Sequence, residues 1–293
     1  MPDIYVSIIC PIYNGEQFID KLIPALLNQD FPHQKYEIII IDNGSNDLTL
    51  EKLKNYPVQV LSEPVIKSSY GARNLGINSA KGDILAFIDS DCIAESNWLK
   101  EGVESLLKNS ADMIAGHVHF IFKDPTSPWE IFDATFHMNQ ELSSTKGYSA
   151  TANLFVKKEL FHQLGLFNSK STSGEDKAWT SKAVASGKKL IYEKNATVNH
   201  PTRNKNELIK KALRTGGGFL NSNRRDKSQA HQIGTSLLFI SKNLFPLPFA
   251  VKKIYLSSPY SFVTKLKIHM VLIVIRNIRS LGLIQATFGK RFR

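Results

Sequence analysis

Two carboxylates, Asp89 and Asp91, stand two residues apart directly after an apolar run, an arrangement that suits metal binding. The run Ile84–Ile88 has the length and composition of a buried strand. Side chains two apart at a strand end project to the same side, so the two carboxylates are expected to share one face. Carboxylate oxygens suit a hard cation such as Mg²⁺ or Mn²⁺ that also binds phosphate. The alternative is a solvated loop in which an Asp caps the next helix.

The elements that must position these carboxylates alternate between strand and helix in the first half of the chain. Continuous apolar, β-branched runs predict strands, and apolar residues at helical spacing predict helices. The predicted strands are residues 5–10, 36–41, 58–61, 83–88 and 112–122, with helices at 18–27, about 47–53, 69–80 and 98–108. This alternation favours a parallel sheet covered by helices on both faces, with ligands bound at the carboxyl ends of the strands.

The second half of the chain is less regular. We predict helices at 129–142, 158–164 and 175–186 and strands at 150–156, 190–192 and 197–199. Beyond His200 the sequence becomes a series of basic helical segments broken by Gly216, Gly217 and Gly218 and by prolines. This change in composition predicts two domains, 1–202 and 203–293.

Five short motifs, in this order, resemble those of the family 2 glycosyltransferases. They are residues 6–14, 41–47, 71–76, 87–91 and 174–176, and they extend over about 200 residues of the chain. The resemblance implies a GT-A fold, a Rossmann-like, mixed but mostly parallel sheet between helices. It also implies an inverting transferase that moves a sugar from a nucleoside-diphosphate sugar to an acceptor hydroxyl, in cell-envelope polysaccharide or glycolipid synthesis.

The resemblance assigns a role to each matching residue. Asp176 would be the catalytic base, and the metal would be held by Asp91, with Asp89 and His200 as further candidate ligands. The donor would be bound by Pro11, Tyr13, Asn14, Asp42, Arg73, Asp89 and Ser90. A Mg²⁺ or Mn²⁺ ion would neutralise the departing diphosphate, and a carboxylate base would take the proton of the acceptor hydroxyl.

Each motif also has a purely structural interpretation. Asp42-Asn43-Gly44-Ser45 is a strong turn signal, and Gly71-Ala72-Arg73 is compatible with close helix packing. Acids such as Glu175 and Asp176 are favourable at a helix start. His200 is either a third metal ligand or a structural residue, and we expect His117, His119, Cys10 and Cys92 to be structural.

Basic residues are concentrated near the C-terminus. The chain carries a formal net charge of +11. Residues 203–293 contain 18 Lys and Arg but only Glu207 and Asp226 as acids, a net charge of +16, which leaves −5 for residues 1–202. Such asymmetry indicates a polyanionic partner, either nucleic acid or an anionic membrane surface. With the resemblance in view, we expect the membrane surface and a glycan or lipid-linked acceptor, and no nucleic acid.

We expect two roles for residues 203–293. The basic residues around the glycine triplet, among them Lys210, Lys211, Arg214, Arg224 and Arg225, resemble a segment that covers the donor diphosphate as a glycine-hinged lid. The basic amphipathic segments beyond residue 241 contain no acid and suit an anionic membrane leaflet. The alternative is a helical cap that packs on the catalytic domain.

The expected location is cytoplasmic, with peripheral attachment to the inner face of the plasma membrane. Two cysteines make no disulfide framework, and residues 1–12 do not read as a secretory signal. No uninterrupted run reaches the roughly 18–20 apolar residues that span a bilayer, so integral insertion is not expected. Two other function classes stay open: a sugar nucleotidyltransferase, and a non-catalytic basic protein that binds membrane surfaces.

Overall fold

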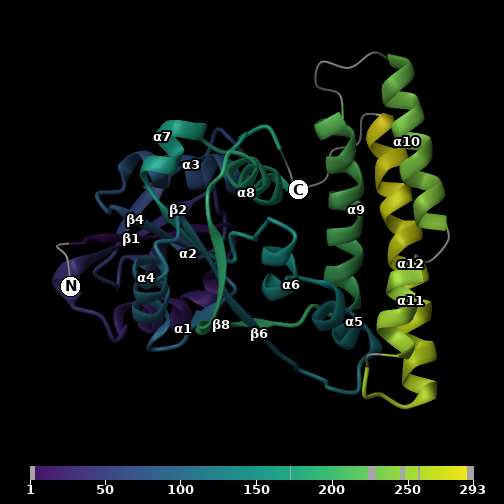
Figure 1. Cartoon of the computed structure of the whole chain (residues 1–293), viewed down its shortest axis with the longest axis horizontal. Coiled ribbons are helices and arrows are strands. Elements are labelled where there is room, and N and C mark those ends of the chain that lie inside the picture. The colour runs from purple at the N-terminus through teal and green to yellow at the C-terminus, as the bar shows by residue number, and fades with distance from the viewer. Residues whose placement is uncertain (1–3, 172, 224–228, 245–247, 257, 289–293) are drawn as a thin grey trace. The chain divides into compact units, whose positions relative to one another are not determined.

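The computed structural model describes residues 4–171, 173–223, 229–244, 248–256 and 258–288, without the side chains of 219–223, 229–233 and 244. Contacts divide the chain into two units (Figure 1). The first contains Met1–Ile121, Met138–Lys170 and Gly174–Pro201, and the second Phe122–His137, Ser171–Ser173 and Thr202–Arg293. The first unit ends at Pro201, whereas the sequence predicts two domains, 1–202 and 203–293, a division that stays a prediction. Residues 122–137, however, group with the C-terminal helices, so the second unit draws on separate stretches of chain.

The first unit is built on a single mixed sheet of eight strands. They are β1 Val6–Ile12, β2 Tyr36–Asp42, β3 Gln59–Ser62, β4 Ile84–Ile88, β5 Ile93–Ala94, β6 Met113–Ile121, β7 Asn153–Lys157 and β8 Leu190–Pro201, in the spatial order β3-β2-β1-β4-β7-β6-β8-β5. Strands β1 to β4 run parallel, β7 is antiparallel to both β4 and β6, and β5 is antiparallel to β8. The mixed sheet implied by the resemblance is therefore confirmed, and the wholly parallel sheet suggested by alternation alone is wrong.

Helices cover both faces of this sheet. One layer contains α1 Glu16–Leu27, α2 Thr49–Leu53 and α4 Trp98–Lys108, and the other contains α3 Ser69–Ser79, α7 Glu159–Leu164 and α8 Glu175–Ala185. Alternate side chains of β1 serve the two layers: Ile8 and Cys10 pack against the first, and Ile9 against the second. The central strands are buried on both sides, which explains their continuous apolar sequence. A short 3₁₀ helix, His33–Lys35, precedes β2.

The structure corrects two local predictions and adds one strand that was not predicted. The single helix expected at 129–142 is two helices, α5 Pro128–Phe136 and α6 Gln140–Thr145, because Met138 between them adopts φ +44°. The two short strands expected at 190–192 and 197–199 are one strand, β8, with a register shift opposite Gly116. Strand β5 has only two residues, too few to leave a sequence pattern.

The second unit is helical. It contains α5, α9 Lys205–Asn223, α10 Gln229–Leu244, α11 Pro248–Tyr255 and α12 Phe262–Thr287, and its core joins α5, α9, α11 and α12. The break expected at Gly216–Gly218 is wrong, because α9 runs through all three glycines. A Cβ on Gly216 would overlap the backbone of Arg279, and a Cβ on Gly282 would overlap the backbone of Leu213. These glycines therefore allow α9 and α12 to pack closely. Arg224 and Arg225 of the expected lid lie outside the described residues.

Helix α12 changes the expectation about membrane segments. Among the described helices it is long and apolar enough, by length and composition, to cross a membrane. It has 26 residues, and an 18-residue stretch of it has a mean hydropathy of 1.3. The sequence concealed this length because basic residues interrupt the apolar runs, although the chain stays helical across them. The core helices of soluble proteins can have the same length and hydropathy, and 39% of this 18-residue stretch is buried in the protein.

Candidate functional site

The loops that follow β1 and β2 are tied together by hydrogen bonds. Asn14, with φ +47°, donates its backbone N–H to Ser45 Oγ at 2.8 Å and accepts from the N–H of Asn46 at 2.9 Å. Asp42, at the end of β2, is 1% exposed and accepts from the N–H groups of Gly44 and Ser45 at 3.0–3.2 Å. The predicted turn is therefore present. It holds Asp42 beside the end of β1, where Ile12 is its register partner.

An ion pair joins helix α3 to the end of β4. Arg73 is 4% exposed, and its guanidinium NH2 lies 2.5 Å from Oδ1 of Asp89. The Asp89 side chain is 31% exposed, so it is held from the protein side and accessible on its outer side. Two predicted donor-binding residues, 16 positions apart, thus form one charged unit.

The turn after β4 directs the two predicted metal carboxylates to different partners. Strand β4 ends at Ile88, and the N–H of Cys92 donates to the carbonyl of Asp89 at 3.0 Å. Asp89 meets Arg73, whereas Oδ2 of Asp91 lies 3.3 Å from Nε2 of His200. The carboxylates are therefore placed by a turn and not, as predicted, by strand alternation, which stops at Ile88.

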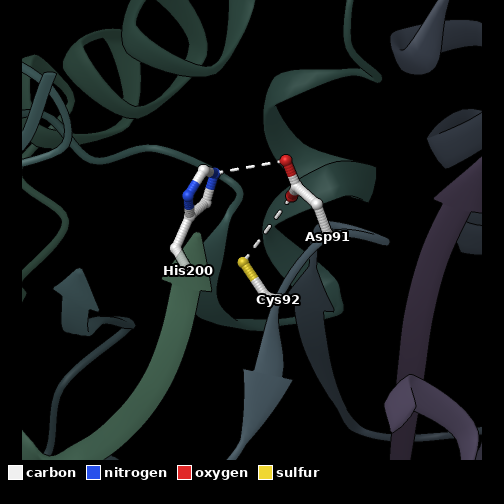
Figure 2. A group of neighbouring side chains, drawn as sticks. All are labelled: Asp91, Cys92 and His200. Carbon is white, nitrogen blue, oxygen red and sulfur yellow. Dashed lines mark hydrogen bonds and ion pairs between the residues drawn. The ribbon is translucent and has the colours of Figure 1, made fainter. Parts of the chain in front are cut away.

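Three potential metal ligands gather at Asp91, as Figure 2 shows. The ligand atoms of Asp91, Cys92 and His200 lie within 4.8 Å of one another, and the Cys92 thiol is 3.9 Å from Oδ1 of Asp91. Strand β5 pairs with β8, and Ile93 lies opposite Asn199. This pairing brings Asp91 and Cys92 close to His200, which is more than 100 positions away in the chain. Cys92, expected to be structural, is indeed buried, and it also faces Asp91.

The hydrogen bonds of His200 indicate that this group fits a divalent cation. Nδ1 lies 2.6 Å from the carbonyl oxygen of Pro201, which can only accept, so Nδ1 carries a proton. In the neutral ring Nε2 is then an acceptor, and it faces another acceptor, Oδ2 of Asp91. A cation bound between them could take Oδ2 of Asp91 and Nε2 of His200 as ligands. Metal-bound histidines usually donate their second N–H to a carbonyl or carboxylate in this way.

The predicted base, Asp176, lies in the first turn of α8. Its Oδ1 accepts from the N–H of Lys177 at 2.9 Å and from the hydroxyl of Tyr70 at 3.2 Å. The carboxylate keeps some exposure, but dense surroundings raise its pKa above the ordinary Asp value by desolvation, and the positive charge of Arg73 opposes the rise. An ionisable group with a raised pKa beside a donor-binding Arg is a reasonable general base.

The other predicted site residues sit at the same edge of the sheet. Pro11 is buried at the end of β1, Tyr13 is 41% exposed just beyond it, and Ser90 is partly exposed in the turn between Asp89 and Asp91. Sequence reasoning missed one contact residue, Tyr70. Its position three residues before Arg73 places both side chains on one face of α3, the only sequence signal it carries.

The first unit also contains a hollow of about 310 Å³. It is lined by Glu95, Asn97, His117, His119, Lys194, Asn195 and Thr197. His117 Nδ1 is 2.8 Å from the Tyr192 hydroxyl, and burial lowers the pKa of His117. None of the predicted donor, metal or catalytic residues lines this hollow.

Comparison with known proteins identifies a matching family. The family model of glycosyl transferase family 2 matches residues 7–165, more than half of the chain. The matched stretch contains the loops after β1 and β2, helix α3 and the turn after β4.

The chain is similar to two named glycosyltransferases and to a solved structure. It is 32% identical over 250 residues to glycosyltransferase AglE of Haloferax volcanii, covering 83% of this chain and 82% of AglE. A shorter match, 33% over 124 residues, covers 41% of this chain and 48% of WfgD, the UDP-Glc:alpha-D-GlcNAc-diphosphoundecaprenol beta-1,3-glucosyltransferase of Escherichia coli. The mannosyltransferase PcManGT from Pyrobaculum calidifontis, in complex with GDP-Man and Mn²⁺, superposes with a TM-score of 0.62 at 17% identity over 97% of this chain and 86% of its own.

Proposed function

Because the chain belongs to glycosyl transferase family 2, we propose that it transfers the sugar of a nucleoside-diphosphate sugar to an acceptor hydroxyl with inversion. The fold of the first unit is that of GT-A glycosyltransferases, and the chain is a glycosyltransferase. Of the alternatives, a nucleotidyltransferase and a non-catalytic basic protein are both disfavoured by this membership.

The donor would lie at the carboxyl ends of β1, β2 and β4. Tyr13, Asn14 and Asp42 would surround the nucleoside, and the exposed side of Asp89 would face the ribose. Pro11, Ser90 and Arg73 complete this donor set, Arg73 by orienting Asp89. PcManGT, whose structure holds GDP-Man, and WfgD, whose name states UDP-Glc, support a nucleoside-diphosphate sugar as the donor class.

Asp91 and His200 would hold a divalent cation, Mg²⁺ or Mn²⁺, whose charge neutralises the departing diphosphate. The observation that carries this proposal is the 3.3 Å approach of two potential ligand atoms, Nε2 of His200 and Oδ2 of Asp91. Asp89 remains a candidate ligand through its exposed side, because its ion pair with Arg73 engages Oδ1. The Mn²⁺ in the PcManGT complex supports a metal-dependent reaction for this chain as well.

Asp176 would act as the general base. Its carboxylate would take the proton of the acceptor hydroxyl while the hydroxyl oxygen bonds to C1 of the sugar. The bond from C1 to the diphosphate oxygen breaks in the same step, and the nucleoside diphosphate leaves. A single base opposite the leaving group gives one in-line displacement, and hence an inverted anomeric centre, as in inverting glycoside hydrolysis.

The acceptor and the second unit are linked in this proposal. WfgD acts on a diphosphoundecaprenol-linked sugar, as its name states, which supports a lipid-linked or cell-envelope acceptor for this chain. Helix α12 exposes apolar side chains along one side, among them Phe262, Leu266 and Met270, while its other side packs in the core of the second unit. No acid occurs between residues 241 and 293. We propose that this side rests on an anionic membrane at the cytoplasmic face.

A thermal-shift screen of nucleoside diphosphates and their sugars, with and without Mn²⁺, tests the proposed function. We expect one nucleotide class to raise Tm, and to do so more with Mn²⁺ present. The best donor then enters a transfer assay with lipid-linked acceptors, and the anomeric coupling constant of the product in NMR reports inversion or retention. The proposal fails if no nucleotide stabilises the protein, and the inverting mechanism fails if the product retains the donor configuration.

A further inference from the structure

A buried tyrosine connects helix α3 to the start of helix α8. Tyr70 is 6% exposed, and its ring packs against Phe167 with centroids 5.9 Å apart. Its hydroxyl accepts the N–H of Glu175 at 3.2 Å and lies 3.2 Å from Oδ1 of Asp176. The contact spans 106 positions of chain, so it exists only because the two helices pack on the same face of the sheet.

The start of α8 needs this hydroxyl. The N-cap position is Gly174, which has φ +79° and makes no side-chain cap. Tyr70 therefore accepts from the N–H of Glu175, one of the first N–H groups of the helix, which have no partner within the helix itself. A phenol has a single proton, and because its oxygen accepts from Glu175, that proton is left to be donated to Asp176. The orientation of the hydroxyl is thus determined by two partners.

The two oxygens of Asp176 are unequally engaged. Oδ1 accepts from the Tyr70 hydroxyl and from the N–H of Lys177, at 3.2 and 2.9 Å. Within the described part of the chain, no hydrogen bond to Oδ2 is found. We infer that Tyr70 is a positioning residue for Asp176: its hydroxyl fixes Oδ1, which turns Oδ2 toward the acceptor hydroxyl whose proton it takes. This inference rests on the proposed role of Asp176 as the base.

The charges around Asp176 define what loss of the hydroxyl would do. Arg73 and Tyr70 approach from α3, Asp89 from the turn after β4, and Lys177 contributes its backbone N–H. Burial raises the pKa of Asp176, and the hydrogen bond from Tyr70 opposes the rise. Burial also raises the pKa of Tyr70, so its hydroxyl stays protonated and donates throughout the neutral range. Removing the hydroxyl should therefore raise the pKa of the Asp176 carboxyl further.

Transfer kinetics of Y70F across pH test the inference, with Y36F as matched control. Tyr36 is equally buried, at 7% exposure, and its hydroxyl binds the carbonyls of Leu26 and Leu27 at the other end of the sheet. We expect Y70F to lower kcat about tenfold or more, the usual effect of losing a hydrogen bond to a charged group. The acid limb of its pH profile should move to higher pH, with an unchanged donor KM. Y36F should match the wild type in all three.

Two results would overturn the inference. A third variant, D176N, distinguishes these results from a failure of the proposed function. Wild-type kinetics in Y70F would show that Asp176 needs no help from Tyr70. A lower kcat with an unmoved acid limb would reduce Tyr70 to a structural residue. Asp176→Asn is assayed alongside: full transfer by that variant contradicts the base assignment itself, whereas an inactive D176N with a wild-type Y70F contradicts only the positioning role.

Discussion

The Arg73 guanidinium and the Asp89 carboxylate form a 2.5 Å ion pair in which the cation is buried and the anion is partly exposed. The buried guanidinium is thus linked to the protein surface by the Asp89 carboxylate. The same helix carries Tyr70, which contacts Asp176. Helix α3 therefore connects the residues proposed to bind the donor and to remove the acceptor proton.

Arg73→Met should weaken donor binding. It leaves Asp89 without its buried partner, so the carboxylate is no longer held for the ribose, and hydrogen bonds to charged groups are worth roughly ten- to a hundredfold in affinity. Calorimetric titration with the donor found by thermal shift measures the effect. Lys108→Met, which removes an exposed cation at the end of α4, is the control. An unchanged Kd in R73M would contradict the proposed orientation of Asp89.

Asp91→Asn and His200→Ala should each weaken Mn²⁺ binding about tenfold or more, because each removes one of the two proposed ligands. Electron paramagnetic resonance of free Mn²⁺ reports this binding without any need for activity. His162→Ala, which changes an exposed histidine of α7, should bind Mn²⁺ like the wild type. Chelation should abolish transfer by the wild type, and Mn²⁺ should restore it. Equal Mn²⁺ affinity in all variants would remove the metal from this site.

Asp176→Asn should stabilise the protein at pH 7 while abolishing transfer. The pKa of Asp176 is raised in the folded state above its unfolded value of about 3.9. The folded protein therefore binds this proton more tightly, so stability is lost as pH rises from about 3.9 through the folded pKa. D176N removes that loss, and its gain in Tm should shrink to nothing as the pH falls toward 4.

Asp20→Asn is the control of opposite sign, because a hydrogen bond from Lys52 lowers the pKa of Asp20. D20N should not raise Tm at pH 7. Differential scanning calorimetry from pH 4 to 8 checks both variants, with about 2–4 °C expected for each kcal/mol in a domain of 150–250 residues. A D176N protein less stable than the wild type at pH 7 would show that Asp176 is not destabilised by burial.

The sequence predicts those elements that have a recognisable local pattern of apolar residues. Strands β1, β2 and β4 are recognisable because both faces are buried and the apolar run is unbroken. The order of the strands, the reversal of β7 and the two-residue β5 depend on pairings between distant segments, which leave no periodic trace. The break at Met138 depends on a single backbone angle.

In the candidate site too, local sequence indicates some residues, and the contacts of the others depend on tertiary packing. Asp89, Asp91 and Asp42 could be proposed from their positions after strands, whereas His200 needed the resemblance, because its approach to Asp91 depends on the β5–β8 pairing. The contact of Tyr70 with Asp176 depends on how α3 and α8 pack, and no spacing encodes it. The glycines of α9 read as a hinge in isolation and become packing residues only when α12 is beside them.

Gly216→Ala and Gly234→Ala should change stability in opposite directions. A Cβ at Gly216 would overlap the carbonyl of Arg279, so α9 and α12 must separate, at a cost of about 1–3 kcal/mol. Gly234, in α10, is exposed with open space around its Cβ position, and Ala there should gain up to about 1 kcal/mol in helix propensity. Urea unfolding followed by circular dichroism measures both. A stabilised G216A would show that α9 and α12 are not in contact at these glycines.

Replacement of Phe262, Leu266 and Met270 by Ser should release the protein from anionic membranes. These side chains are 49–71% exposed, so the change leaves the core of the second unit intact and removes only apolar surface available to lipid. We expect the wild type to float with vesicles containing anionic lipid, and the triple variant to bind roughly tenfold or more weakly, given the apolar area lost.

Replacing exposed Leu48, Val65 and Leu142 of the first unit in the same way should leave flotation unchanged. Raising the salt concentration should weaken the wild-type interaction, because the basic residues act over about a Debye length. If the wild type fails to float, or if both triple variants float equally, the exposed side of α12 has another role.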